Sequence, residues 1–172
     1  MKQSKFPIYL SGERIFSNSQ KAINLQDKTK LGEYKDGKVI YSGFEAVYLI
    51  EKHLAVFISL KKEKELTENE LISFLSKKDK NFQIKYIIFK YLKNKGYIVK
   101  TGLKFGEEFR VYKKNEKHAK WIVFPISSTD IIQPKELISK SRITHSTGKK
   151  LLLGIVDSEE DITFYEIDWV KP

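Results

Sequence analysis

Cysteine is absent from this chain of 172 residues. Without a thiol the protein cannot form a disulfide framework, a thiolate zinc site or a cysteine nucleophile. Long apolar runs are absent as well, since none approaches the length of about 18 residues that a membrane span requires. Residues 1–16 contain no apolar stretch long enough for a secretory signal. These absences predict a cytoplasmic protein with no membrane partner.

Acidic residues are in the minority. The chain has 22 Asp and Glu against 32 Lys and Arg, which gives a formal net charge of +10. Each phosphate that a Lys or Arg side chain neutralises releases counterions, so this excess favours a polyanionic partner. Lysine-rich surfaces also occur in proteins that bind no nucleic acid, and charge alone leaves that alternative open.

The chain has no internal repeat or low-complexity segment, and we divide it at the polar stretch 77–81 into domains of residues 1–80 and 82–172. Strand-like segments in the first domain are separated by turn residues and by apolar residues at helical spacing. Thr67 and Glu70 have the spacing of a capping box at a helix start. The predicted segments are strands at 8–10, 14–16, 38–41 and 54–60, and helices at 44–53 and 68–78.

The second domain begins with an amphipathic helix over 82–96, which Gly96 ends as a C-cap glycine. Strand-like segments follow, and Pro134 marks the first turn of a short helix among them. This order predicts an α+β domain with a mixed sheet. The segments are strands at 97–100, 109–113, 120–124, 150–156 and 162–169, and a helix at 134–140.

Three groups of different chemistry stand at the ends of predicted strands: Tyr112, His118 and Lys149. A phenol, an imidazole and an ammonium are the group types needed to cut RNA without a metal. One takes a proton from a ribose 2′-hydroxyl, one gives a proton to the departing 5′-oxygen, and one stabilises charge on the phosphate. Taken singly, they also fit ordinary roles, as a packed strand tyrosine, a solvated loop histidine and a surface lysine.

Several short motifs of the second domain occur in an order that is typical of one family. They are GYIVKTG at 96–102, KFG at 104–106, FRVY at 109–112, His118 before an aromatic-aliphatic strand, Arg142, and STGKKLL at 146–152. In this order they resemble the catalytic C-terminal domain of the archaeal tRNA-splicing endonucleases. The first half matches more loosely, chiefly through residues 43–57.

The resemblance implies a fold of class α+β. It consists of a small N-terminal mixed α/β domain followed by a C-terminal restriction-endonuclease-like domain, whose mixed sheet is flanked by helices. Family members cut precursor tRNA at both exon–intron boundaries, within a bulge-helix-bulge element. They leave a 2′,3′-cyclic phosphate and a 5′-hydroxyl, and they need no metal or other cofactor. The implied activity is that of a tRNA-intron endonuclease, with precursor tRNA as the partner.

By position, Tyr112, His118 and Lys149 match the family's catalytic tyrosine, histidine and lysine. The resemblance makes His118 the general acid and assigns Lys149 to the extra charge on the pentavalent phosphorus. A phenol is mostly protonated at neutral pH and is therefore a weak base. A neighbouring ammonium such as that of Lys149 lowers the pKa of the phenol and favours its deprotonation. Lys150 is the alternative to Lys149, because alternation along a strand points the two in opposite directions. The chain departs from the family in having only five residues between Tyr112 and His118, and in Glu108, where an aspartate is common.

Arg142 lies seven residues before Lys149, where the family has an arginine that sandwiches a flipped bulge base. A guanidinium stacks on a base for roughly 1–3 kcal/mol. The alternative is a cation at the end of the short helix, near its backbone carbonyls. His145 and His53 are interpreted as structural and receive no task.

The acidic run 157–161 interrupts a basic chain, and on its own it reads as a solvated turn between strands. In the family the corresponding loop docks into a basic cleft of another subunit, so Asp157, Glu159, Glu160 and Asp161 are expected at a subunit interface. The C-terminal strand is expected to pair with its counterpart across a two-fold axis. The resemblance implies a homotetramer, or a heterotetramer with a related non-catalytic subunit, and gives the first domain a role in packing and subunit contact.

Three alternatives remain. The chain could be a non-catalytic subunit that positions RNA in the same heteromeric assembly, although it retains all three catalytic residue types. It could be a metal-dependent nuclease of restriction-like fold that uses Glu107 or Glu108 with Lys104, although magnesium needs a second converging carboxylate. It could also be a basic RNA-binding module without activity.

Overall fold

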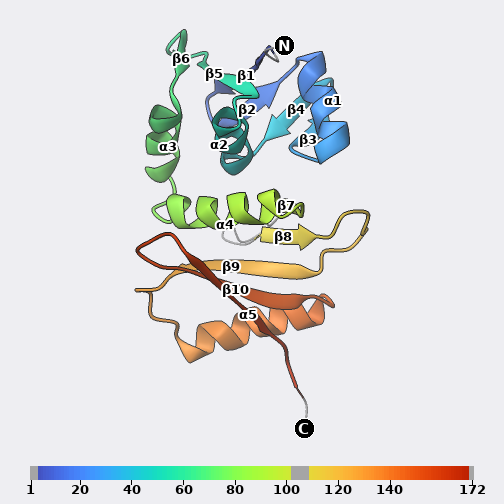
Figure 1. The fold of residues 1–172 in the computed structure, drawn as a ribbon, viewed down its shortest axis with the longest axis vertical. Helices are drawn as coiled ribbons and strands as arrows, with labels where there is room; N and C mark the ends of the chain where they lie inside the picture. Colours follow the sequence, from blue (N-terminus) through green and yellow to red (C-terminus); the bar gives the residue numbers. More distant parts are fainter. Residues whose placement is uncertain (1–3, 102–108, 171–172) are drawn as a thin grey trace. The chain divides into compact units, whose positions relative to one another are not determined.

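The structure, a computed structural model, describes residues 4–101 and 109–170. The chain folds into two units, residues 1–83 and 84–172, and each unit has its own sheet (Figure 1). Both sheets contain parallel and antiparallel pairs and are accompanied by helices, which confirms the predicted α+β class with mixed sheets. The roles predicted for the two halves stay predictions. None of the helices in the described residues is long and apolar enough to cross a bilayer.

The first unit is built on a six-stranded sheet with the order β3-β4-β2-β1-β5-β6, in which β1 and β5 are parallel. Alternation along β1 sends Phe6, Ile8 and Leu10 into the core. The predicted capping box is confirmed at the start of α3. The elements are β1 (Phe6–Ser11), β2 (Arg14–Ser17), α1 (Gln20–Thr29), β3 (Glu33–Lys35), β4 (Lys38–Tyr41), α2 (Gly43–Glu51), β5 (Ala55–Ser59), β6 (Lys64–Leu66) and α3 (Glu68–Ser76).

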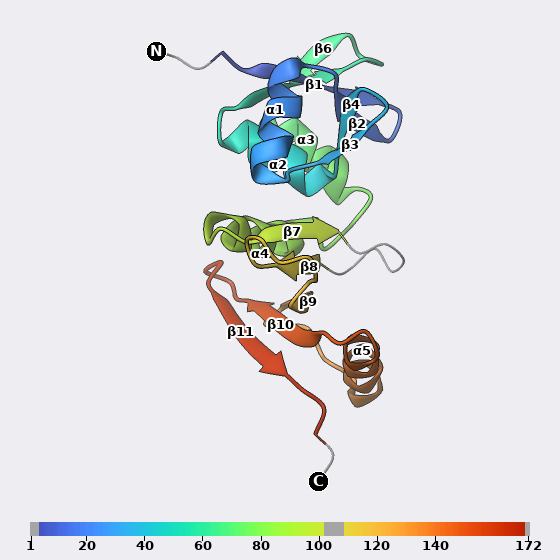
Figure 2. The ribbon, with the colours of Figure 1, turned by 90° about the vertical axis from the view of Figure 1, so that its right-hand side faces the viewer.

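The second unit is built on a five-stranded sheet with the order β11-β10-β9-β8-β7, which can be followed in Figure 2. Strands β9 and β10 are parallel, and the other neighbours are antiparallel. The elements are α4 (Phe82–Asn94), β7 (Ile98–Thr101), β8 (Phe109–Tyr112), β9 (Trp121–Ser127), α5 (Pro134–Ser146), β10 (Lys150–Val156) and β11 (Ile162–Ile167).

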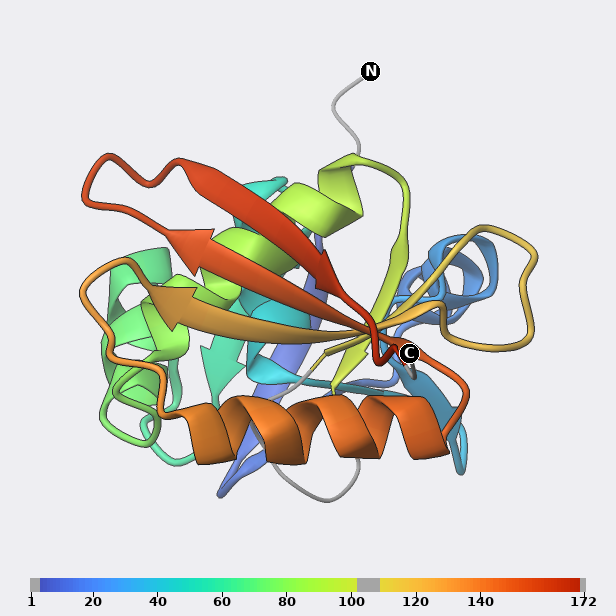
Figure 3. The same ribbon diagram turned by 90° about the horizontal axis from the view of Figure 1, so that it is seen from below.

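Helices α4 and α5 cover opposite faces of this sheet, and Figure 1 shows β9 and β10 between them. On the α4 face, a Cβ added to Gly154 of β10 would lie 2.7 Å from Ile88 Cδ1, so glycine allows the close approach of the helix. On the α5 face, the core cluster of Ile122, Phe124, Leu151 and Leu153 packs against Leu137 of α5. Figure 3 shows α5, in orange, along this side of the strands.

The structure corrects several of the expected elements. The helix that begins at Pro134 continues to Ser146 rather than ending at residue 140. Helix α1 and the short strands β3 and β6 were not expected from the sequence. Helix α1 contains only three apolar residues, Ala22, Ile23 and Leu25, and of these Ala22 alone is fully buried, so its helical pattern is weak in the sequence. The expected turn at Gly102, the motif at 104–106 and the alternative acids Glu107 and Glu108 lie outside the described residues.

Candidate active site

Three strand ends meet at one end of the second sheet. Strand β8 is antiparallel to β9, and β9 is parallel to β10, so the last residue of β8 lies at the same end as the first residues of β9 and β10. In this register Val111 lies opposite Trp121, and Trp121 lies opposite Lys150. Tyr112 is the residue after Val111 and the last residue of β8, and Lys149 is the residue before Lys150, directly before β10. The structure therefore brings two of the three predicted residues to one end of the sheet.

Tyr112 and Lys149 also share a face. Alternation places Tyr112 on the face of Ile122, since Arg110 lies opposite Ile122 and two residues before Tyr112. The same alternation, extended one residue before β10, places Lys149 on the face of Leu151, which α5 covers. The backbones of β8 and β10 lie two strand spacings apart, or about 10 Å. A tyrosine and a lysine side chain can converge across that distance on one group between them.

Lys150 takes the opposite face. Its ammonium lies 2.6 Å from Glu166 Oε1 and 3.5 Å from Asp168 Oδ2, and the indole N–H of Trp121 donates to the other oxygen of Glu166 at 2.7 Å. The hydrogen bond from Lys150, and then that from Trp121, holds the pKa of Glu166 below its usual range, while Glu166 raises the pKa of Lys150. Lys150 is thus engaged with two carboxylates, away from the face of Tyr112.

The end of α5 fixes the position of Lys149. Gly148 has φ of 65°, and its N–H donates to the carbonyl of His145 at 3.0 Å. The N–H of Lys149 donates to the carbonyl of Thr144 at 2.9 Å, which completes a Schellman motif. The Lys149 ammonium donates to the carbonyl of Thr147 at 2.9 Å, using one of its three donors. The helix end therefore delivers Lys149 to β10 in a defined direction.

His118 lies in the connection between β8 and β9. The N–H of Lys120 donates to the carbonyl of Val111 at 2.8 Å, which closes this loop beside Tyr112. Ala119 is buried and anchors the loop, while the side chain of His118 is exposed. The short segment between Tyr112 and His118 forms a turn, in which the N–H of Glu116 donates to the carbonyl of Lys113 at 3.1 Å. The imidazole therefore belongs to the same end of the sheet as the phenol and the ammonium.

Arg142 is exposed and lies within α5, one turn before His145. The interpretation of Arg142 as a cation at the end of a short helix is therefore wrong, because the helix continues for four more residues. Its guanidinium is presented by the same helix whose C-terminal cap positions Lys149.

The acidic run forms the exposed turn between β10 and β11. The Asp157 carboxylate accepts the N–H of Glu159 at 2.9 Å and the N–H of Asp161 at 3.0 Å, and the N–H of Asp157 donates to the carbonyl of Asp161. The carboxylate of Asp157 is thus part of the turn itself. Glu159, Glu160 and Asp161 are exposed around it, so the turn presents a preformed acidic tip.

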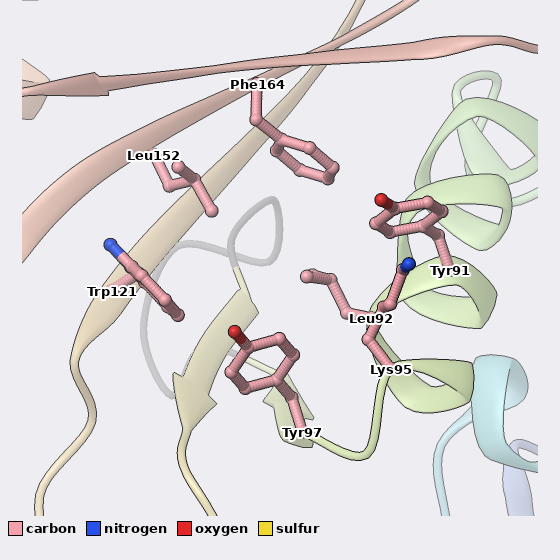
Figure 4. A pocket seen from close by; sticks show the side chains of 7 residues that line it. All are labelled: Tyr91, Leu92, Lys95, Tyr97, Trp121, Leu152 and Phe164. Carbon is pink, nitrogen blue, oxygen red and sulfur yellow. The ribbon is translucent and has the colours of Figure 1, made fainter.

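A pocket of about 400 Å³ lies on the α4 side of the sheet (Figure 4). Aromatic rings dominate its lining: Tyr97 meets Trp121 edge-on at 5.5 Å between centroids, and Tyr91 meets Phe164 at the same distance. The pocket contains none of the three predicted catalytic residues. Among the described residues, no group of three or more His, Cys, Asp or Glu side chains could hold a metal ion.

One contact near the site could not be predicted from the sequence. The rings of His145 and Trp169 lie 4.9 Å apart, between the last turn of α5 and the segment that follows β11. The two residues are 24 positions apart in the chain. Their proximity depends on how β11 runs beside β10, for which no local pattern gives a signal.

Comparisons with known proteins show the family of the chain. The family model of the tRNA intron endonuclease, catalytic C-terminal domain, matches residues 82–164. The tRNA-splicing endonuclease of Pyrococcus abyssi is 38% identical over 164 residues, which are 95% of this chain and 95% of that protein. The tRNA-splicing endonuclease of Methanothermobacter thermautotrophicus is 36% identical over 155 residues, 88% and 89% of the two chains. The chain therefore belongs to the tRNA-splicing endonuclease family, which confirms the resemblance found in its motifs.

Proposed function

We propose that this chain is a tRNA-intron endonuclease that cuts precursor tRNA at both exon–intron boundaries, within a bulge-helix-bulge element. The reaction is a transesterification that needs no metal and leaves a 2′,3′-cyclic phosphate and a 5′-hydroxyl. Family membership supports the substrate, and the net charge of +10 suits a polyanion. The single observation that carries the mechanism is the register that puts Tyr112 and Lys149 on one face at one end of the sheet, beside the loop of His118.

In the proposed mechanism one proton is removed and one is donated, and one bond to phosphorus forms as another breaks. Tyr112, acting as the phenolate, accepts the proton of the ribose 2′-hydroxyl and becomes the neutral phenol, while the 2′-oxygen bonds to phosphorus. The bond from phosphorus to the 5′-oxygen breaks, and His118 gives its proton to that oxygen. Lys149 stabilises the additional negative charge on the phosphorus oxygens, a role suited to a compact ammonium.

The nucleophile is the ribose 2′-oxygen of the substrate itself, so the protein contributes to catalysis largely by positioning the nucleotide that is cut. The 2′-oxygen must lie in line with the 5′-oxygen that leaves. A paired A-form helix does not offer that freedom, whereas an unpaired bulge nucleotide can be splayed out. Arg142 is proposed to stack on such a base, because its guanidinium is exposed on the helix that leads to Lys149.

A cleavage assay tests the proposal. Wild type, Tyr112→Phe and His118→Ala are mixed in excess with an end-labelled RNA that carries a bulge-helix-bulge element, and binding is measured in parallel. We expect each substitution to slow cleavage by at least about 100-fold, the usual contribution of acid–base catalysis, with RNA affinity retained. The new 5′ ends should accept a phosphate from polynucleotide kinase without prior phosphatase treatment. Undiminished cutting by His118→Ala would refute the assignment.

The same assay separates the alternatives. Cleavage that persists in excess EDTA contradicts the metal-dependent nuclease, and cleavage that EDTA abolishes supports it. Binding without products, by the chain alone, supports either a non-catalytic subunit or a plain RNA-binding module. Addition of a related catalytic subunit then distinguishes these two, because only the former contributes to a cutting assembly.

A further inference from the structure

Arg110 of β8 carries a positive charge for which the described residues supply no carboxylate. Its Nε is buried and has no hydrogen-bond partner among the described residues. Within the part of the chain that the structure describes, its guanidinium makes one hydrogen bond, from Nη2 to the carbonyl of Thr101 at 3.4 Å, which is longer than usual. A guanidinium stays charged in proteins and has five N–H donors. Most of the donors of Arg110 are therefore left for a group outside the described chain.

Such an arrangement is unfavourable in the protein alone. A charge that is partly withdrawn from water needs a counter-ion or hydrogen bonds to compensate. Lys140 of α5 shows the usual solution on the same face of the sheet, because its ammonium lies 3.2 Å from Glu136 Oε1 and 3.8 Å from the centre of the Phe124 ring. Arg14 of the first unit is exposed to water instead. Arg110 is half-buried, and an anionic ligand would supply what it lacks.

Arg110 lies on the face of the proposed catalytic groups. It is two residues before Tyr112 on β8, so both side chains leave the same face of the strand, about 7 Å apart along it. It lies opposite Ile122 of β9, which belongs to the core that α5 covers. The guanidinium and the groups assigned to the chemistry therefore face the same side of the sheet.

The hydrogen bond to β7 directs the guanidinium away from the phenol. Thr101, whose carbonyl accepts this bond, lies opposite Phe109. Tyr112 lies opposite Ile98, at the other end of this strand pair. Arg110 therefore points away from the group on which Tyr112 acts. A ligand that contacts both side chains must be longer than a single phosphate.

An RNA strand has that length and supplies the missing charge. The planar fork of a guanidinium matches two oxygens of one phosphate and suits it better than an ammonium does. We propose that Arg110 binds a backbone phosphate of the substrate, beside the phosphate that is cut. The proposal rests on the proposed function and deepens it: the contact holds the strand in register, so that the scissile phosphate lies between Tyr112 and Lys149. Phosphate contacts of this kind position a strand and are independent of its sequence.

The salt dependence of RNA affinity tests the contact. The probe is a bulge-helix-bulge RNA with 2′-deoxy substitutions at both cleavage positions, which removes the nucleophile. Arg110→Met keeps a long side chain and removes its charge, and it should weaken binding about 10- to 100-fold at low salt. The slope of log affinity against log salt should become shallower by about one, as for the loss of one phosphate contact. Arg110→Lys should recover part of the affinity, and Arg14→Met, the matched control from the first unit, should change neither quantity.

Neutral phosphates identify the partner of Arg110. Methylphosphonate is placed in the probe at one position at a time, at the two phosphates on either side of each scissile one. In wild type, neutralisation of the phosphate that Arg110 binds should weaken binding by about as much as Arg110→Met does. In the Arg110→Met protein the same substitution should cost nothing further, because the two changes remove one contact.

Thermal unfolding without RNA separates this role from a structural one. If Arg110 served the fold, its removal would lower the melting temperature. For a ligand contact, Arg110→Met should melt at or above the temperature of wild type, since it removes a partly buried charge without a partner.

The contact is refuted if Arg110→Met keeps the affinity and the salt slope of wild type, or if the losses caused by methylphosphonate are the same in both proteins. A lower melting temperature of Arg110→Met that Arg110→Lys restores would assign the residue to the fold instead. Failure of the proposed function looks different: wild type would not cut the unsubstituted RNA, whereas failure of this contact alone leaves that cleavage intact.

Discussion

Adjacent lysines at the start of β10 have different chemical surroundings because they stand on opposite sides of one sheet. Lys150 is committed to Glu166 and Asp168 on the α4 face. Lys149 follows the cap of α5 and shares the face of Tyr112. A side chain that is already neutralised by two carboxylates has little charge left for a phosphate, so the ammonium of the proposed site is that of Lys149.

Alanine at each of the two lysines tests this difference. Lys149→Ala should lower the single-turnover cleavage rate about 100- to 1,000-fold, the range for removal of one group that stabilises transition-state charge. Lys150→Ala should leave the rate within about tenfold and change stability little, because exposed ion pairs are weak. Each variant is first checked for its melting temperature and RNA affinity. Equal losses in both variants, or a larger loss in Lys150→Ala, would contradict the assignment of Lys149.

The sequence could predict the residue types of the site but not which lysine faces it. Tyr112, His118 and Lys149 stand in motifs whose order is recognisable. The choice between Lys149 and Lys150 depends on the register of β10 with β9, which is a long-range property of the sheet. Two neighbouring lysines give no hydrophobic pattern from which that register could be read.

At the scale of a single element, the C-terminal cap of helix α5 depends on Gly148, which lies directly before Lys149 of the proposed site. Its φ of 65° lies in the left-handed region, where an alanine costs roughly 1 kcal/mol. A Cβ there would meet no heavy atom of the described residues within 4 Å, so the penalty comes from the backbone rather than from a clash. Gly148→Ala should lower the free energy of unfolding by about that amount. It should slow cleavage as well, because the cap directs Lys149.

Urea unfolding and single-turnover cleavage, measured on the same preparations, check this prediction. Gly148→Asn is the matched variant, because asparagine tolerates the left-handed region better than alanine. It should lie between wild type and Gly148→Ala in both measurements. A Gly148→Ala protein with wild-type cleavage would show that the cap does not position Lys149.

The N-terminal cap of α3 makes stability depend on pH. The Glu70 carboxylate accepts hydrogen bonds from the Lys64 ammonium at 2.7 Å and from the Thr67 N–H at 2.9 Å, and these lower the pKa of Glu70 from 4.5 to about 2. A carboxyl with a lower pKa in the folded state stabilises it above the unfolded pKa, and this contribution is lost as the pH falls through the folded one.

Glu70→Gln keeps a side chain that can complete the capping box and removes the charge. The difference in unfolding free energy between wild type and Glu70→Gln should be greatest above about pH 4.5 and should vanish as the pH falls towards 2. Because the pair is exposed, added salt should reduce the difference. Chemical unfolding at pH 7, 4 and 2.5 measures it, with Glu68→Gln, outside the capping box, as the control. A difference that is constant with pH would contradict the prediction.

Elements with a strong local signal could be predicted, and elements that depend on distant contacts could not. The spacing of Thr67 and Glu70 gave the start of α3, and Gly96, with φ of 88°, stands where the end of α4 was expected. The last turns of α5 carry mostly polar residues of modest helix propensity. They are held by the burial of Thr144, which depends on contacts outside the helix, and by the cap at Gly148, which is a local signal for the helix end that the prediction did not use.

At the scale of the whole molecule, the acidic tip is a local exception to the positive charge. Four of the five residues 157–161 are acidic in a chain of net charge +10. The Asp157 carboxylate accepts two hydrogen bonds from the backbone of the turn, and these stabilise the conformation in which the tip presents its acidic side chains. An acidic tip on a protein of positive net charge favours association between copies of the chain, or with a basic relative, through electrostatic complementarity. We propose that the tip docks on another subunit of a tetramer.

The double variant Glu159→Gln/Glu160→Gln tests this docking, because both side chains are exposed at the tip and their loss leaves the backbone of the turn unchanged. Wild type should scatter light as a tetramer if four copies suffice, and as a smaller species if a related subunit is required. The double variant should form smaller species than wild type and cut RNA more slowly. High salt should mimic the variant, because exposed charges are screened. Asp157→Asn is the control: it removes one charge but keeps an oxygen for the N–H groups of Glu159 and Asp161, so the assembly should persist. An unchanged mass for the double variant would show that the tip is only a solvated turn.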